Sequence, residues 1–256
     1  MLQEFFENIA DFKILMKTHQ VVVSGSLVLQ LLLPRDRISW PVTDMDIYVP
    51  CGTGQHIANY LNIKGYSNIT ETLPPHTRYQ FSQSHIHNVM TFTRLQRTID
   101  VIVSISSNPL LPIFCFHSTT VMNYFNADIF FSAYPSLTTN FKALINPFRF
   151  ESSKPTSVFK RCLDKYVACG FLFAFNPNAW DVASNKTVHE CQEDYNCPHR
   201  MRTSVDNGCF RFNFGDSNGL HSDDMADDIG PPVTWMLGGH MCNSENMSHS
   251  FLSTLS

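Results

Sequence analysis

The sequence of 256 residues contains little charge, and that charge is not gathered into runs. Charged residues make up 16% of the chain, the net charge is -4, and there is no long run of Lys and Arg. A bound polynucleotide needs a local basic patch, so the composition gives no general attraction to nucleic acid or to acidic membranes. DNA is therefore not expected as a partner.

Long apolar runs are also missing. The longest candidate, residues 21–33, is interrupted by Ser24, Gly25, Ser26 and Gln30, whereas a membrane helix needs about 20 apolar residues. The first 20 residues lack the basic start, the long apolar centre and the small-residue cleavage site of a secretory signal. These absences predict a cytoplasmic protein with no membrane partner, in which most of the eight cysteines are reduced.

Three common enzyme motifs are absent as well. The chain has no Gly-x-Ser-x-Gly, no Walker phosphate loop and no Gly-x-Gly-x-x-Gly. Their absence argues against hydrolase, P-loop and Rossmann readings. The chain does have 43% hydrophobic residues, including 21 Phe, which is enough for an aromatic core.

Hydrophobic spacing in the first 108 residues alternates between the helical and the strand period. It predicts a mixed α/β core with helices over residues 2–17, 27–33 and 52–66 and strands over residues 21–23, 44–49, 86–95 and 98–104. The last two strands are expected to form a hairpin around Gln96 and Arg97.

Residues 109–175 show a helical and aromatic pattern, including an amphipathic stretch over residues 157–171. From residue 176 the chain is polar and irregular, with possible strands in DNGCFRFNFGD and PPVTWMLGG. We therefore expect an α+β protein with three parts: a core over residues 1–108, a helical segment packing on it over residues 109–175, and an irregular, partly β region over residues 176–256.

The stretch TDMDIYV places two acids in an apolar strand. Because side chains alternate along a strand, Asp44 and Asp46 share one face and Met45 and Ile47 the other. Paired carboxylates are costly to bury without a cation, and Mg²⁺ prefers carboxylate oxygens. Asp100, alone in RTIDVIVS, would supply a third carboxylate if its strand runs beside the first. Three such acids could hold two metal ions for a phosphoryl displacement.

A Gly-Ser step stands between the predicted strand at residues 21–23 and the following helix. Free backbone N–H groups at a helix start bind phosphate, and glycine permits close approach. Gly25 and Ser26 are therefore candidates for holding a triphosphate. Plainer readings stay open: the step as a turn with a helix cap, the Asp-x-Asp as a strand-end feature, and Asp100 as a partner of Arg97.

Taken together, Gly25-Ser26, Asp44-x-Asp46 and Asp100 resemble the signature of the nucleotidyltransferase superfamily, which has the DNA polymerase beta-like fold. The likeness covers roughly residues 20–105. VVSGSLVLQ, TDMDIYV, HSTTVMNYF and AYPSLT carry a narrower resemblance, up to about residue 172, to nucleotidyltransferase-like proteins of mushroom-forming fungi.

This resemblance implies a small mixed sheet flanked by helices and a metal-dependent transfer of a nucleoside monophosphate from a nucleoside triphosphate to an acceptor hydroxyl. It implies that Asp44 and Asp46 bind two Mg²⁺ or Mn²⁺ ions, that Asp100 binds the catalytic one, and that Gly25 and Ser26 contact the β- and γ-phosphates. The acceptor is open: a small molecule, a protein or RNA. The chain departs from the pattern in two ways: the gap between Ser26 and Asp44 is long, which suggests a longer helix or an inserted loop at residues 34–43, and Ser26 replaces a second glycine.

The stretch SVFKRCLDKYVACGF offers further candidates. The resemblance suggests that Lys160 or Lys165 contacts the triphosphate and that Tyr166 stacks on the base. The alternative is an ordinary amphipathic helix with a solvated charged face.

A second set of candidates is His189, Cys191, Cys197 and His199, which are zinc-ligand types at an unusual spacing. The alternative is a polar loop. For the whole chain, the alternative to an active enzyme is an inactive nucleotidyltransferase-like module that binds a nucleotide or regulates a partner.

Overall fold

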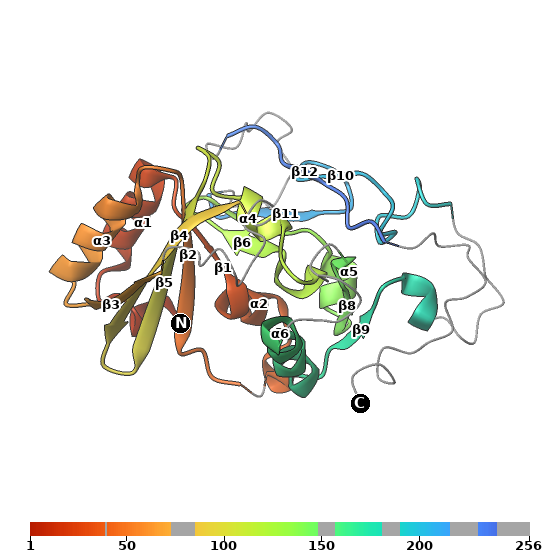
Figure 1. Ribbon diagram of the computed structural model, residues 1–256, viewed down its shortest axis with the longest axis horizontal. Coiled ribbons are helices and arrows are strands. Elements are labelled where there is room, and N and C mark those ends of the chain that lie inside the picture. Colours follow the sequence, from red (N-terminus) through yellow and green to blue (C-terminus); the bar gives the residue numbers. More distant parts are fainter. Residues whose placement is uncertain (39, 73–84, 148–156, 181–189, 216–229, 240–256) are drawn as a thin grey trace.

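The computed structural model describes residues 1–38, 40–72, 85–147, 157–180, 190–215 and 230–239. Within them the chain is α+β, with a large mixed sheet flanked by helices (Figure 1). None of the helices in these ranges is both long and apolar enough to span a bilayer.

Among the described residues, the main sheet has eight strands in the order β11-β7-β6-β1-β2-β5-β4-β3. Of these described strands, only β2 and β5 pair in parallel; the other neighbours are antiparallel. The strands of this sheet are β1 (Val22–Ser24), β2 (Asp44–Val49), β3 (Ser67–Thr72), β4 (Ile86–Arg94), β5 (Arg97–Ser104), β6 (Asn123–Phe125), β7 (Ile129–Ser132) and β11 (Phe210–Asn213).

Two small sheets add a parallel pair and an antiparallel pair: β8 (Lys142–Leu144) with β9 (Leu172–Ala174), and β10 (Arg202–Thr203) with β12 (Thr234–Trp235). The α-helices are α1 (Ile9–His19), α2 (Gly25–Leu32), α3 (Gly54–Ile63), α4 (Leu111–Phe114), α5 (Pro135–Thr138) and α6 (Ser157–Ala168). Short 3-10 turns are η1 (Leu2–Glu4), η2 (Arg35–Arg37), η4 (Thr119–Val121) and η6 (Pro177–Trp180).

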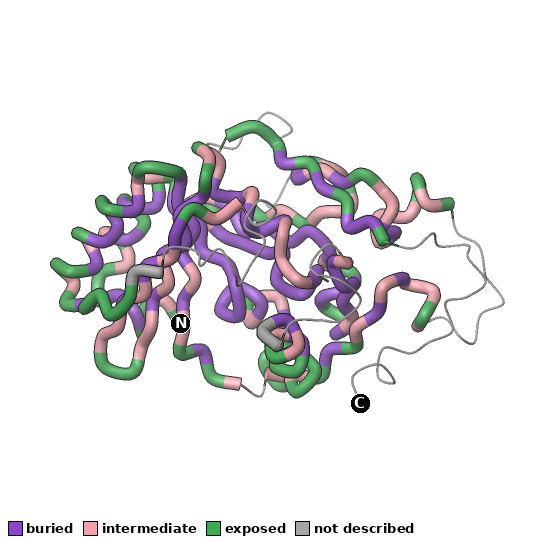
Figure 2. Tube along the Cα trace, in the orientation of Figure 1, coloured by how far each residue is buried: buried purple, intermediate pink, exposed green. Residues whose placement is uncertain are grey.

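The two faces of the central strands enter different cores. Met45, Ile47 and Val101 pack with α1 and α3, whereas Tyr48 and Ile102 pack with the aromatic groups that follow β5. Figure 1 shows α1 and α3 on one side of these strands and α2 and α6 on the other. The strands between them are mostly buried (Figure 2). This alternation of side chains is what puts the acids of β2 on the α2 and α6 side.

Most of the elements expected in the first 108 residues are confirmed. The predicted strand over residues 44–49 coincides with β2, and α2, α3, β4 and β5 lie where the spacing placed them. The strand β3 was not expected. The helix predicted over residues 2–17 is wrong in its first half, because the chain breaks after η1 and α1 begins only beyond Asn8. There the Asn8 side chain accepts a hydrogen bond from the Asp11 backbone N–H at 3.2 Å.

The helical segment expected over residues 109–175 is also partly wrong. Its aromatic runs form β6 and β7, joined by a turn in which the Asn126 side chain accepts from the N–H groups of Asp128 and Ile129. Short apolar runs suit a buried strand as well as a helix, and here the tight turn decides for the strand. Since β6 pairs with β1, the main sheet continues across residue 108.

The C-terminal region is anchored by one buried cation. Arg202 is 1% exposed and donates to both carboxylate oxygens of Asp206 and to the backbone carbonyl of Ala133. Its guanidinium also lies 4.7 Å from the ring centre of Tyr134 and 5.4 Å from that of Trp235. The described residues around Arg202 and Trp235 therefore contact the core through specific interactions. The strands expected around residues 206–216 and 231–239 are confirmed as β11 and β12.

Candidate active site

The parallel pairing of β2 and β5 brings two of the predicted acids side by side. Asp46 stands directly opposite Asp100, and Asp44 stands opposite Thr98. Residues opposite each other on neighbouring strands point to the same face, so all three acids share one face of the sheet. The strand of Asp100 therefore runs beside that of Asp44 and Asp46, as the convergence of the three acids requires.

Gly25 begins α2 and lies against Asp46. The antiparallel pairing of β1 with β2 places Ser24 opposite Asp46, so the next residue lies beside the acid. A Cβ atom added to Gly25 would lie 1.9 Å from Asp46 Oδ2, and Gly25 has φ +78°. Both the contact and the backbone angle therefore require glycine at this position.

Asp44 is the outermost acid and has three polar neighbours. Its Oδ2 lies 3.5 Å from the Ser26 hydroxyl and 4.0 Å from Lys165 Nζ, and its Oδ1 accepts from the Thr43 hydroxyl at 3.3 Å. The side chains of Lys165 and Asp44 are 47% and 40% exposed, so water screens this ion pair.

Asp100 has a shorter and more specific partner. The Thr91 hydroxyl of β4 donates to Asp100 Oδ1 at 2.6 Å, and Thr91 stands directly opposite Asp100 in the hairpin. Arg97, the alternative partner considered from sequence, instead bonds to the Val42 carbonyl and to Glu4. Thr91 was not singled out from the sequence.

The carboxylates of Asp46 and Asp100 lean apart. Asp46 leans towards Gly25 on the β1 side, and Asp100 leans towards Thr91 on the β4 side. This is the arrangement expected of two like charges on adjacent strands. In keeping with it, the described residues contain no group of three His, Cys, Asp or Glu side chains already placed to hold a metal ion.

The electrostatics of the site show an excess of negative charge. Burial raises the pKa of Asp46 to about 7, and repulsion by Asp100 and Asp44 adds to the rise, while Lys165 opposes it. Burial also raises the pKa of Asp100, against the hydrogen bond from Thr91. A divalent cation would relieve the repulsion, and carboxylate oxygens are the donors that Mg²⁺ and Mn²⁺ prefer. The donor chemistry therefore fits such an ion.

The candidates on α6 separate into different environments. Lys165 reaches Asp44, whereas Lys160 lies five positions earlier, roughly 140° away around the helix axis. Tyr166 is 5% exposed and packs against Phe171 and His117, which leaves little ring surface for a base. Burial raises the pKa of Tyr166 well above its ordinary value, so its phenol is neutral.

The proposed zinc ligands are only partly covered by the structure. His189 lies outside the described residues. Cys197 is fully buried, and no metal-ready group includes it, Cys191 or His199 among the residues described. The zinc reading therefore gains no support from this region.

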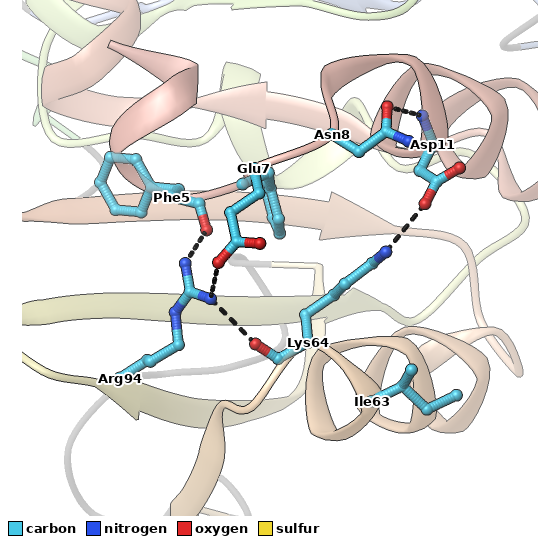
Figure 3. Close-up of a pocket in the computed structure, with 8 residues that line it drawn as sticks. Phe5, Glu7, Asn8, Asp11, Ile63, Lys64 and Arg94 are labelled. Carbon is cyan, nitrogen blue, oxygen red and sulfur yellow. Dashed lines mark hydrogen bonds and ion pairs between the residues drawn. The ribbon is translucent and has the colours of Figure 1, made fainter.

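A surface hollow of about 270 Å³ lies away from the acids, next to the hairpin residue Arg94. Its charged groups are paired with each other: Lys64 with Asp11 at 2.8 Å, and Arg94 with Glu7 at 3.6 Å (Figure 3). Arg94 also donates to the backbone carbonyls of Phe5 and Lys64. These contacts hold the N-terminal segment against the sheet. We therefore interpret the hollow as part of a packing contact and not as a binding site.

Comparison with known proteins leaves the acidic face as the main guide to function. No protein-family model, no curated protein and no solved structure matches this chain.

Proposed function

We propose that the protein is a metal-dependent nucleotidyltransferase that moves a nucleoside monophosphate from a nucleoside triphosphate to an acceptor hydroxyl. The observation that carries this proposal is the register of β2 and β5, which aligns Asp46 with Asp100 beside the glycine that begins α2. The resemblance noted in the sequence supports the same reading. The fold alone would not, because one fold can serve many functions.

In this proposal Asp44, Asp46 and Asp100 hold Mg²⁺ or Mn²⁺. When bound, the ions neutralise charge on the attacking and leaving oxygens of the phosphoryl group. Gly25 leaves room for the Asp46 carboxylate beside the start of α2. The backbone N–H groups of the first turn of α2 and the Ser26 hydroxyl, which lies beside Asp44, donate to a phosphate of the nucleotide. Lys165, beside Asp44, carries a positive charge that suits the triphosphate. The roles of the chain are thus positioning and charge compensation.

The test is a metal-dependent thermal shift. Each of the four nucleoside triphosphates, with Mg²⁺ or Mn²⁺, is added to the wild type and to a double variant, Asp44→Asn with Asp46→Asn. A ligand that binds only the folded state raises the melting temperature, so we expect a shift in the wild type that the double variant loses. Asp36→Asn, an exposed acid in η2, is the matched control and should keep the shift. A wild type with no shift for any nucleotide would end the proposal.

A second candidate is favoured by the way the acids lean apart. If they do not close on an ion in a catalytic arrangement, the chain is an inactive nucleotidyltransferase-like module that binds a nucleotide or regulates a partner. Incubation with labelled triphosphate and a cell extract separates the two. Release of pyrophosphate and a labelled acceptor support the enzyme, whereas nucleotide binding without release supports the module.

A further inference from the structure

The hydrogen bond between Thr91 and Asp100 is the best-defined contact that any of the three acids makes. It joins directly opposed residues of β4 and β5 at 2.6 Å, a short distance typical of a hydroxyl donating to a carboxylate. A threonine on a strand has few χ1 rotamers, so its hydroxyl is held in place without a large loss of entropy. The contact therefore fixes the orientation of the Asp100 carboxylate.

The direction of this bond decides which oxygen stays available. Oδ1 of Asp100 is the atom that accepts from Thr91, on the β4 side of the strand. The other oxygen of this carboxylate, Oδ2, remains available to an external ligand. Asp46 lies on the other side, on β2, so an ion held between the two strands would meet Asp100 through Oδ2.

We propose that Thr91 is a positioning residue for Asp100, whose hydroxyl occupies Oδ1 and so presents Oδ2 to a divalent cation. This inference rests on the proposed function and adds to it a residue outside the acid trio. Hydrogen-bond partners of metal ligands orient the ligand, and their removal commonly weakens metal affinity by about 10- to 100-fold.

Thr93 provides a control within the same strand. It lies two residues from Thr91, on the same face of β4, and stands opposite Thr98. Both threonines are half-buried. If Thr91 only filled space on this face, replacing either threonine by valine would have the same effect, because valine keeps the shape and removes the hydroxyl.

The experiment measures Mn²⁺ binding to the full chain by the electron paramagnetic resonance signal of free Mn²⁺, without nucleotide. Four variants are compared with the wild type: Thr91→Val, Thr91→Ser, Thr93→Val and Asp100→Asn. We expect Thr91→Val to weaken Mn²⁺ binding by about 10-fold or more, Thr91→Ser to restore most of it, and Thr93→Val to match the wild type. Circular dichroism melting identifies any variant that does not fold, and Thr91→Ala, which also lacks the hydroxyl, takes the place of Thr91→Val if that variant does not fold.

The outcomes separate this inference from the proposed function. Wild-type Mn²⁺ binding that Asp100→Asn weakens but Thr91→Val leaves unchanged overturns the inference alone. Equal weakening by Thr91→Val and Thr93→Val, or failure of a folded Thr91→Ser to bind more tightly than Thr91→Val, also overturns it. A wild type that binds no Mn²⁺ overturns both the inference and the proposed function.

Discussion

The carboxylate of Asp46 occupies the space that a side chain at Gly25 would need, with Oδ2 1.9 Å from the position of an added Cβ. Residue 25 is therefore restricted by the acid on the neighbouring strand as well as by its own φ of +78°. The first turn of α2 and the acidic face depend on each other.

Replacing Gly25 by alanine tests this dependence. Gly52 is a matched control, because it has φ +85° but no atom within 4 Å of an added Cβ. Gly52→Ala should cost only the backbone strain, roughly 1–2 kcal/mol, whereas Gly25→Ala should cost more, because the Asp46 carboxylate must move as well. Urea unfolding of both variants measures the difference. Equal losses would contradict the close approach described here.

The raised pKa of Asp46 predicts a pH dependence of stability. An acid whose pKa is about 7 in the folded state and 3.8 in its ordinary state binds protons more tightly when folded. Its contribution is then favourable at low pH and is lost as the pH rises from about 4 to about 7. Asp46→Asn should therefore be more stable than the wild type at pH 8, and this advantage should vanish near pH 4.

The free energy of unfolding in urea, measured from pH 4 to pH 8 with a chelator present to remove metal ions, tests this prediction. Asp36→Asn, on the surface, is the control for replacing an Asp by Asn outside the acidic face. An Asp46→Asn variant that is less stable than the wild type at pH 8 would mean that Asp46 is not held in the charged, repelled state inferred here.

Lys165 is predicted to compete with a metal ion for Asp44, from which it lies 4.0 Å. Without nucleotide, Lys165→Met should therefore bind Mn²⁺ about two- to five-fold more tightly, the size expected for a solvent-screened ion pair. Arg161→Met, which removes an exposed cation one turn earlier on α6, is the control. Calorimetry measures both affinities, and weaker Mn²⁺ binding by Lys165→Met would refute the competition.

Arg202 should contribute more to stability than any surface cation. Arg202→Met leaves the Asp206 carboxylate without its partner and should cost about 3–5 kcal/mol. The double variant with Asp206→Asn should recover part of this loss. The Arg200 guanidinium lies over the Tyr195 ring, and Arg200→Met should lower the free energy of unfolding by about 1 kcal/mol or less. Denaturant unfolding compares the three; similar losses for Arg200 and Arg202 would show that the buried pair is not the anchor.

Local rules were sufficient to predict the acidic face, because period-two alternation fixes which residues of β2 share a side and the Gly-Ser step marks the start of a helix. The hydrogen-bond partner of Asp100 was harder to predict from the sequence. A hairpin around Gln96 and Arg97 places Thr93 opposite Asp100, whereas the observed pairing of Arg94 with Arg97 places Thr91 there. Moving the turn by one residue shifts every cross-strand pair by two, and Leu95, which takes φ +56°, gives no sequence signal for this turn.

Long-range contacts set the remaining limits. The apolar runs NYF and IFFS suit a helix as well as a strand; the turn at Asn126 makes them a hairpin, and β6 joins the main sheet by pairing with β1, about a hundred residues earlier. The contact of Lys165 with Asp44 likewise depends on how α6 packs against α2, through Tyr166, Leu29 and Leu33. The sequence makes Lys160 and Lys165 equal candidates for contacting the triphosphate. Only the packing of α6 shows which of the two lies near Asp44.

The pairing of β6 with β1 has a practical consequence for dissecting the molecule. A protein truncated near residue 108 would lack β6 and would expose the hydrogen-bonding edge of β1, which lies next to the strand that carries Asp44 and Asp46. An exposed strand edge can pair with a strand of another molecule. Such a fragment is expected to self-associate, so biochemical work on the acids calls for recombinant protein that retains at least β6 and β7.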